Sequence, residues 1–385
     1  MPGPPMKRLP VLVLEGALLS LAGCTPAAPP ATPTSLSSAI PSATLVASLS
    51  AEPPPPSRST PTLSDEDGFH DKAPGLIRVM TFNVNWDSIF PDDDPQNHDL
   101  RAFSRVDSFR RILGAVQPDI LCLQEINYLR RDSELAEYLE GLLGASESES
   151  WRVAHVSDDL IATRFGLMER GYELETGSIL TDLDQAAALV DLPDEAFGPT
   201  DLYLICSHFK SGGAPEDILL RLRQADAIMA QVRDFESAGG HLDLPSGTPF
   251  VILGDFNAYD TDPARHLQAL TEGDIYDEQR YGVDLDPDWD ETALEDARPS
   301  HNGQGVHFYT WRDDGAPFAP AALDRVIFSD SVMQMTNAFV LNTRLLTDEV
   351  LAAHGLQRDD VLLDPASGTH DHFPIVVDFS VAEGG

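Results

Sequence analysis

Residues 249–257 read PFVILGDFN, a run of apolar side chains that ends in Gly254, Asp255 and Asn257. Short apolar runs bounded by turn-forming residues are typical of buried strands. Side chains two positions apart share one face of a strand, so Asp255 and Asn257 can point at the same group. Gly254 has no Cβ and lets the backbone approach that group closely. The stretch therefore predicts a buried strand that brings a carboxylate and an amide to one site.

Five further apolar runs lie along the chain, with helical periodicities between them. The runs are 76–84 (LIRVMTFNV), 119–126 (DILCLQEI), 201–209 (DLYLICSHF), 323–329 (LDRVIFS) and 373–380 (FPIVVDFS), and the helical patterns lie at 105–116, 133–144 and 216–235. Strands mixed with helices indicate an α/β or α+β domain. Because the runs are apolar on both faces, we expect sheets covered on both sides. The stretches 184–200 and 277–305 are rich in acids, prolines and glycines and are interpreted as surface excursions.

Polar side chains stand at the ends of these runs, where α/β folds place their sites. They are Asn83, Glu125, His208, Asp255 with Asn257, Asp324, and Asp371 with His372. One such residue alone would be read as a cap or a turn. The whole set consists of carboxylate, amide and imidazole groups, and it indicates a single site.

Such a set suits the hydrolysis of a phosphate ester assisted by a hard divalent cation. These cations prefer one or two carboxylates together with amide oxygen, water and phosphate. Glu125 is the natural ligand, with Asn83 and Asp371 helping through water. The cation would neutralise phosphate charge and stabilise the leaving oxygen.

The remaining polar residues fit the other needs of the reaction. Asp255 would orient the attacking water, and Asn257, His208 and His372 would donate to the phosphoryl oxygens. A carboxylate partner holds an imidazolium in place, and Asp324 would do so for His372.

Five segments resemble, in order, the signature motifs of the endonuclease/exonuclease/phosphatase superfamily. They are MTFNV (80–84), PDILCLQE (118–125), GDFNA (254–258), LDRVIFS (323–329) and HDHFPIVV (370–377). The resemblance covers about residues 76–380. It implies a four-layer α/β sandwich of two mostly antiparallel sheets packed face to face, with helices outside, and dependence on Mg²⁺ or Mn²⁺. It also implies the following roles: Asn83 and Glu125 at the metal, Asp371 beside it, His208 on the phosphate, Asp255 and Asn257 orienting water and phosphate, and Asp324 paired with His372.

The segment SHFKSGG (207–213) is similar to a segment of secreted bacterial nucleases of this superfamily. Lys210 and Ser211 would bind a phosphate next to the reacting one, as an ammonium group commonly does. The chain has only three lysines, which makes Lys210 conspicuous. Arg221, on the helical pattern that follows, is interpreted as part of a solvated helix face.

Weaker candidates surround this set. Arg164 lies in LIATRF, which resembles the family's strand before a common Ser-Arg pair. Trp311 and Phe373 would stack on a base or sugar, or pack at the rim. His370 stands where the family usually has a small residue, and it would be a phosphate donor, a second metal ligand or a residue without a role.

The charge balance leaves the substrate open. With 25 Lys+Arg against 63 Asp+Glu, the net charge is −38, which repels polyanions over most of the surface. A nuclease is the first interpretation, a phosphodiesterase or phosphatase for small or lipid phosphates the second, and a catalytically inactive binding lipoprotein the third. A nuclease needs a local basic track and a lipid esterase an exposed apolar hairpin. No apolar hairpin is obvious, and a track would come from arginines 101, 105, 110, 111, 130, 131, 221 and 223.

The N-terminus predicts export and a lipid anchor. Lys7 and Arg8 precede an apolar stretch at 11–23 that is too short to span a bilayer, as in a signal peptide. LAGC (21–24) resembles a bacterial lipobox, which would make Cys24 the lipidated first residue. Residues 1–23 are therefore assigned to a signal peptide, 24–74 to the lipidated cysteine and a Pro/Ser/Thr-rich linker, and 75–385 to the catalytic domain. We expect a monomer held at the cell envelope, with its catalytic domain outside the cytoplasm.

Two further cysteines, Cys122 and Cys206, lie inside apolar runs. They are interpreted as buried strand residues with free thiols, since free cysteine is among the most buried residue types. A disulfide between them is the alternative, although no framework spacing supports it.

Overall fold

The computed structural model describes residues 72–381, apart from 92–93, 95, 97–103, 144–149, 171–184, 243, 260–264 and 316. The predicted signal peptide, Cys24 and nearly all of the predicted linker lie outside the described residues, so these assignments stay predictions. Within the described part of the chain, no helix combines the length and apolar character needed to cross a membrane.

Six strands form the first sheet: β1 (Ile77–Asn83), β2 (Ile120–Gln124), β3 (Arg152–Val156), β4 (Asp159–Thr163), β11 (Met333–Val340) and β12 (Ile375–Val381). They follow the order β11-β12-β1-β2-β4-β3. β1 and β2 run parallel, and the other neighbours run antiparallel.

The second sheet also has six strands: β5 (Gly166–Arg170), β6 (Gln185–Asp191), β7 (Leu202–His208), β8 (Phe250–Asp255), β9 (Glu295–Asp296) and β10 (Asp324–Phe328). Their order is β5-β6-β7-β8-β10-β9. Here β7 and β8 are the parallel pair, and the other pairs are antiparallel. All six predicted runs are therefore strands of one sheet or the other.

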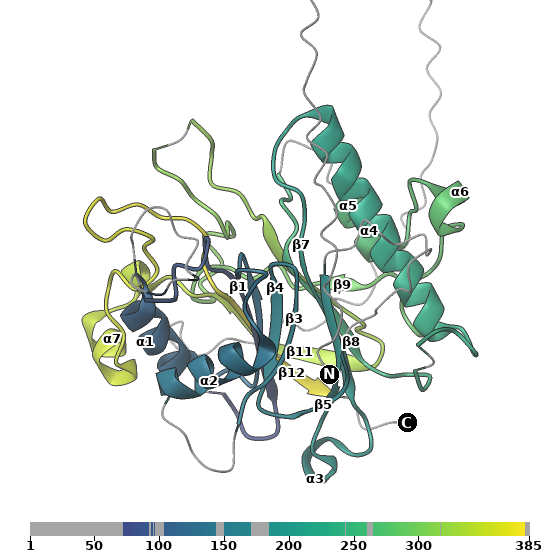
Figure 1. The fold of residues 1–385 in the computed structure, drawn as a ribbon, viewed down its shortest axis with the longest axis horizontal. Helices are drawn as coiled ribbons and strands as arrows, with labels where there is room; N and C mark the ends of the chain where they lie inside the picture. Colours follow the sequence, from purple (N-terminus) through teal and green to yellow (C-terminus); the bar gives the residue numbers. More distant parts are fainter. Residues whose placement is uncertain are drawn as a thin grey trace, which may run out of the picture. The chain divides into compact units, whose positions relative to one another are not determined.

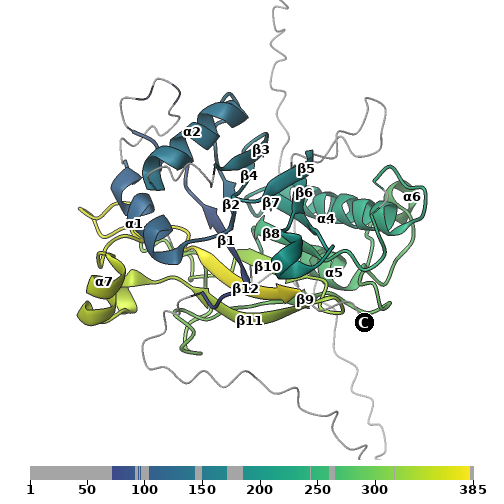
Figure 2. The same ribbon diagram turned by 90° about the horizontal axis from the view of Figure 1, so that it is seen from below.

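The helices are α1 (Val106–Val116), α2 (Asp132–Leu143), α3 (Asp194–Phe197), α4 (Pro215–Glu236), α5 (Arg265–Glu272), α6 (Glu278–Tyr281) and α7 (Asp348–His354), with a short 3₁₀ helix η1 (Thr343–Leu345). α1 and α2 lie beside the first sheet and α4 and α5 beside the second, with both sheets between them (Figure 1, Figure 2). The predicted four-layer sandwich of mostly antiparallel sheets is confirmed.

Alternation along the central strands explains why both sheet faces are covered. On β7, Leu204 and Cys206 belong to the core that includes the first sheet, whereas Tyr203 and Ile205 belong to a second core with α4. Successive side chains of a strand point to opposite faces. The runs are therefore apolar throughout because neither face meets water.

Each parallel pair is joined by a helix, as a parallel connection requires. α1 connects β1 to β2, and α4 connects β7 to β8. At the carboxyl ends of these pairs stand Asn83 and Glu125 in one sheet, and His208 and Asp255 in the other. This topology sets the position of the site.

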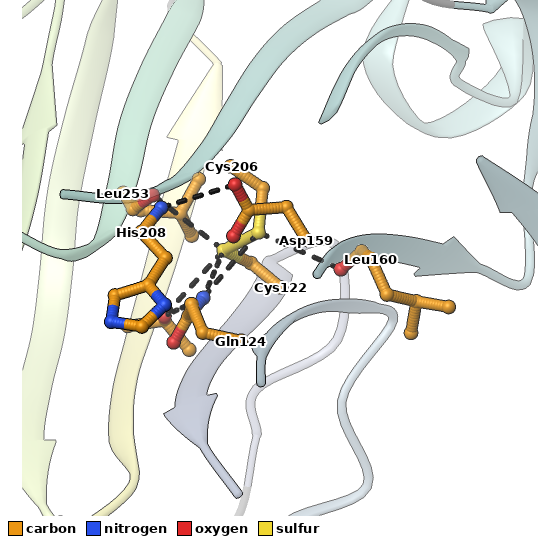
Figure 3. The surroundings of a disulfide bond; sticks show 8 residues. Cys122, Gln124, Asp159, Leu160, Cys206, His208 and Leu253 are labelled. Atoms are coloured by element: carbon orange, nitrogen blue, oxygen red, sulfur yellow. Dashed lines mark hydrogen bonds between the residues drawn. A yellow bond between two sulfur atoms is a disulfide. The ribbon is translucent and has the colours of Figure 1, made fainter. Parts of the chain in front are cut away.

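The interpretation of Cys122 and Cys206 as free thiols is wrong, because the two residues form a disulfide between β2 and β7 (Figure 3). Their Cα atoms lie 5.6 Å apart although 84 positions separate them in sequence. The bond joins the two sheets. The sequence carries no spacing signal for it, since the contact arises only from the packing of one sheet on the other.

The interpretation of 184–200 as a surface excursion is also wrong in part. Residues Gln185–Asp191 form β6, and the side chains of Ala186, Ala187 and Ala188 are buried. Alanine favours helices over strands, so the composition of this segment concealed a strand. The stretch 277–305 contains α6 and β9 and buries His301, so it is only partly a surface excursion.

Candidate active site

The ends of the parallel strands open into one pocket of about 500 Å³. Glu125 follows β2, His208 and Asp255 end β7 and β8, and Asp371 and His372 precede β12. All five side chains line this pocket. Residues separated by up to 247 positions are thus brought together, as their places at strand ends predicted.

The buried carboxylate of Asp255 lies at the centre of the site. Its Oδ2 accepts a hydrogen bond from Asn83 Nδ2 at 3.1 Å. The Nε2 atoms of His208 and His372 lie 3.6 Å and 3.5 Å from the same oxygen. Two imidazoles therefore flank one carboxylate oxygen.

His372 is held by the carboxylate that the sequence predicted. Its Nδ1 lies 2.9 Å from Asp324 Oδ2, which also accepts a hydrogen bond from the Thr310 hydroxyl at 2.6 Å. Burial alone would lower the pKa of His372, but the charges of Asp324 and Asp255 outweigh it and hold the pKa well above its usual value. The two carboxylates therefore favour the protonated form of His372, whose Nε2 lies on the side of Asp255.

His208 has a matching partner that the sequence did not reveal. Asp158, in the turn between β3 and β4, places its Oδ2 2.8 Å from His208 Nδ1. Asp159 accepts the His208 backbone N–H at 3.1 Å (Figure 3). Burial alone would lower the pKa of His208, but the Asp158 hydrogen bond and the charge of Asp255 outweigh it and raise the pKa to about 10. Acids in β-turns are common, so nothing marked Asp158 in the sequence.

Asn257 reaches the pocket differently from the prediction. β8 ends at Asp255, and Asn257 has a left-handed backbone with φ 48°. Its N–H donates to Asp255 Oδ1 at 2.8 Å, and its Nδ2 donates to the Phe209 carbonyl at 2.9 Å. The two side chains therefore do not share a strand face, because Asp255 itself turns the chain. Both still line the pocket.

The predicted metal residues form the other side of the site. Glu125 accepts hydrogen bonds from Asn83 Nδ2 at 3.0 Å and from the Trp86 backbone N–H at 2.9 Å. Asp371 accepts from Asn85 Nδ2 at 2.5 Å and from Trp311 Nε1 at 3.0 Å. Burial raises the pKa of Glu125 despite the nearby His208.

This donor set fits a hard divalent cation. Glu125, Asp158, Asp255 and Asp371 line the pocket and outnumber its two histidines. Asn85, beside Asp371, has a buried Oδ1 without a hydrogen-bond partner. A buried oxygen left unpaired is unfavourable, and amide and carboxylate oxygens are the ligands such cations prefer.

A second group of possible ligand atoms lies on Asp255, Asp324 and His372, all within 4.8 Å of one another. Two of these residues are already joined, since His372 Nδ1 lies 2.9 Å from Asp324 Oδ2. We therefore expect the cation at Glu125 and Asp371, with Asn83 orienting the Glu125 carboxylate.

A left-handed turn builds the metal side. Asn85, Trp86 and Asp87 have φ angles of 56°, 49° and 61°, a conformation unfavourable for residues other than glycine. The buried Asp87 is fixed by Arg130 at 3.4 Å and by the Asn127 N–H at 2.9 Å. Strain of this kind persists where the surroundings over-determine it, often at functional sites.

The interpretation of Arg221 as a solvated residue is wrong. Its side chain is buried, and Nη1 donates to the carbonyls of Lys210 and Gly212 at 2.9 Å and 2.7 Å. Gln224, one turn further along α4, accepts the Lys210 N–H at 2.9 Å. The loop folds back over that helix face and covers it. Arg221 and Gln224 thus fix the loop that places Lys210 and Ser211 in the pocket.

Of the weaker candidates, only one lines the pocket. Trp311 lines the pocket, whereas Phe373 is buried and unavailable for stacking on a substrate. Arg164 follows β4 at the end of the sheet opposite Glu125, and its guanidinium lies 5.2 Å from the centre of the Trp151 ring, so the structure does not bring it to the site. His370 Nδ1 lies 3.1 Å from Asp314 and His370 does not line the pocket.

The arginines do not form the expected basic track. Arg110, Arg111, Arg130 and Arg131 each pair with an acid, and Arg105 is buried as Arg221 is. Arg101 lies outside the described residues. Arg223 does not line the pocket. Acidic partners thus neutralise Arg110, Arg111, Arg130 and Arg131.

The loop around Trp311 carries exposed apolar side chains that were not expected. Val306, Phe308 and Phe318 are each more than half exposed. No pattern in the sequence indicated this exposure, because the three residues are spread among polar and glycine-rich positions.

Comparisons with known proteins identify a family for this chain. A model of the Endonuclease/Exonuclease/phosphatase family matches residues 80–336. No curated protein matches the sequence. Among solved structures, the human Nocturnin catalytic domain with bound sulfate is 17% identical, with coverage of 80% of this chain and 95% of that chain and a TM-score of 0.45.

Two further solved structures are similar to the same extent. ANGEL2, a 2',3'-cyclic phosphatase in complex with adenosine-2',3'-vanadate, is 15% identical, with coverage of 80% and 96% and a TM-score of 0.49. The endonuclease/exonuclease/phosphatase from Bacteroides vulgatus is 16% identical, with coverage of 80% and 99% and a TM-score of 0.46.

The family match spans well over half of the chain and contains most of the residues that line the pocket. The chain therefore belongs to the endonuclease/exonuclease/phosphatase family and is a hydrolase that acts on phosphate ester bonds.

Proposed function

We propose that the protein is an exported phosphodiesterase that acts on nucleic acid. The observation that carries the phosphodiesterase part is the approach of two carboxylate-held histidines, His208 and His372, to one oxygen of Asp255. Hydrolysis of a phosphodiester needs a group that orients water and donors for the phosphoryl oxygens. This arrangement provides both within a few ångströms.

The residues divide the reaction as follows. Asp255 orients a water molecule and takes its proton as the water oxygen bonds to phosphorus and the bond to the leaving oxygen breaks. Nε2–H of His208 and of His372 donate to the phosphoryl oxygens, where negative charge develops. Glu125 and Asp371 would hold Mg²⁺ or Mn²⁺, which when bound neutralises phosphate charge and stabilises the leaving oxygen.

Nucleic acid is favoured by the loop that Arg221 fixes. It places Lys210 and Ser211 in the same pocket as the catalytic residues. An ammonium group there suits a second phosphate of a chain. The active form that we propose is a monomer.

The disulfide supports the proposed location. Disulfides persist in oxidising compartments and are rare in the cytosol, and Cys122–Cys206 lies in the middle of the sandwich. Export with a lipid on Cys24 would place the catalytic domain in such a compartment, at the cell envelope.

A second candidate is a phosphodiesterase acting on lipid. Val306, Phe308 and Phe318, exposed and within seven positions of Trp311 in sequence, favour it, since exposed apolar side chains mark contact with apolar partners. A catalytically inactive binding protein fits less well, because both His–Asp pairs are intact.

A side-by-side assay tests these alternatives. Purified full-length protein is given plasmid DNA, RNA, sphingomyelin vesicles and inositol phosphates, with Mg²⁺, Mn²⁺ or EDTA. We expect cleavage of nucleic acid that EDTA abolishes. Cleavage of the vesicles but of neither nucleic acid would overturn the nuclease in favour of the second candidate.

A further inference from the structure

Trp86 combines an exposed ring with a fixed backbone. Its side chain lines the pocket and is 54% exposed, whereas its neighbours Asn85 and Asp87 are buried. Its own N–H donates to Glu125 Oε2 at 2.9 Å, and the Asp87 N–H donates to the Glu125 carbonyl at 3.0 Å. The ring is therefore presented next to the predicted metal ligand by a part of the chain that cannot easily move.

The backbone of this turn is held in an unfavourable conformation. Three consecutive residues with left-handed φ are kept by hydrogen bonds to Glu125 and by the buried pair Asp87–Arg130. Glu125 does not need an aromatic side chain at position 86, because its contact is with the Trp86 backbone N–H. Holding Glu125 in place therefore does not explain why residue 86 has an indole ring.

A second tryptophan stands across Asp371. Asn85, next to Trp86, donates to Asp371 Oδ2, and Trp311 Nε1 donates to Asp371 Oδ1. The indole N–H of Trp311 is used in this bond, so its apolar ring is what remains for a ligand. Two of the four tryptophans of the chain therefore line one side of this pocket.

The negative charge of the protein bears on the role of these rings. Nucleic-acid binding usually draws its affinity from cations on phosphates, but the net charge is −38 and the described arginines near positions 110 and 130 are paired with acids. Stacking on aromatic rings is an alternative source of affinity that needs no positive charge.

We propose that Trp86, with Trp311, forms a subsite for a nucleobase attached to the scissile phosphodiester. This inference rests on the proposed phosphodiesterase activity and adds the position at which a base of the substrate binds. Because stacking adds to the affinity that Lys210 provides through phosphate, KM for an oligonucleotide depends less steeply on salt concentration than phosphate contacts alone would make it.

The experiment compares two oligomers with the same number of phosphates. One is oligothymidylate, and the other is an oligomer of abasic tetrahydrofuran units. The full-length protein and the variants Trp86→Ala, Trp86→Phe and Tyr276→Ala are assayed on both with Mg²⁺ or Mn²⁺. Tyr276 is an exposed aromatic residue that does not line the pocket, so its variant is the matched control.

We expect the unaltered protein to prefer oligothymidylate. Trp86→Ala should raise KM for oligothymidylate on the order of tenfold and change kcat little. The KM for the abasic oligomer should not change. Trp86→Phe should keep most of the preference, and Tyr276→Ala should match the unaltered protein. Melting temperatures of the variants separate these effects from misfolding.

Other results would overturn the inference. Equal KM values for the two oligomers, or an equal effect of Trp86→Ala on both, would exclude a base subsite while leaving the phosphodiesterase intact. If the protein hydrolysed only sphingomyelin vesicles, the two tryptophan rings would contact a lipid and not a base. A protein that cleaves neither oligomer nor bis(p-nitrophenyl) phosphate would refute the proposed activity itself.

Discussion

Asp158 Oδ2 lies 2.8 Å from Nδ1 of His208. The contact parallels the one between Asp324 and His372 at 2.9 Å, and in each pair the acid belongs to one sheet and the histidine to the other. A ring held at Nδ1 has its Nε2 directed and its charge stabilised. Both rings consequently approach Asp255 from fixed positions.

Asp158→Asn should lower kcat on the order of 10²-fold, the usual contribution of a positioned proton donor. The asparagine keeps the size of the side chain but not its charge, so the pKa of His208 falls and its ring is held less firmly. Steady-state hydrolysis of a phosphodiester checks this. Asp290→Asn, at an exposed position, is the control. If Asp158→Asn had the same kcat as Asp290→Asn, Asp158 would have no role in holding His208.

Arg221→Leu should raise KM about tenfold for a substrate with a second phosphate, a change of about 1.4 kcal/mol. The substitution removes two hydrogen bonds that hold the loop carrying Lys210 and Ser211. A substrate with a single phosphate should be affected much less. Arg223→Leu on the same helix is the control, and equal KM changes for both substrates would argue against a role in placing the loop.

Replacing both disulfide cysteines by alanine should lower the free energy of unfolding by about 4 kcal/mol, from the entropy of closing a long loop. The bond links positions 84 apart and lies in the core. Urea unfolding of the oxidised protein and of Cys122→Ala/Cys206→Ala measures the difference. An unchanged midpoint would show that the bond does not clamp the two sheets.

Glu236 should make the protein less stable at alkaline pH. Burial, with the charge of Asp288, raises the pKa of Glu236 from 4.5 to about 8, and its Oε1 has no hydrogen-bond partner. The folded state therefore keeps a proton that the unfolded state has released. This contribution to stability is fully present below about pH 4.5 and is lost as the pH rises toward 8.

Glu236→Gln removes this titration, so its advantage in stability over the unaltered protein should grow between pH 5 and pH 8.5. Urea midpoints at several pH values measure it. The exposed Glu195→Gln is the control, and a Glu236→Gln difference that is constant with pH would refute the assignment.

Much of the site could be predicted from the sequence because its polar residues directly follow the apolar runs that form strands. Glu125, His208 and Asp255 each follow an apolar run, and the parallel pairs place the ends of those runs together. The local pattern thus determined both the strand and its polar end. The sheets were predictable for the same reason.

The rest depends on contacts between distant segments. The Asp158 carboxylate stands in an ordinary turn and acquires its role only when β4 lies beside the end of β7. Cys122 and Cys206 meet through sheet packing, and Arg221 is buried because a loop covers its helix face. None of these contacts has a signature in the local sequence.

The hydrolysis rate of Asp255→Asn on a simple phosphodiester such as bis(p-nitrophenyl) phosphate, in Mg²⁺ or Mn²⁺, tests the central claim most directly. Asp255 is the residue on which both histidines converge, and its amide cannot take the proton of the attacking water. We predict a fall in kcat on the order of 10³-fold in a protein that melts at the temperature of the unaltered one. A folded Asp255→Asn variant that keeps its kcat would contradict the assignment of this pocket as the catalytic site.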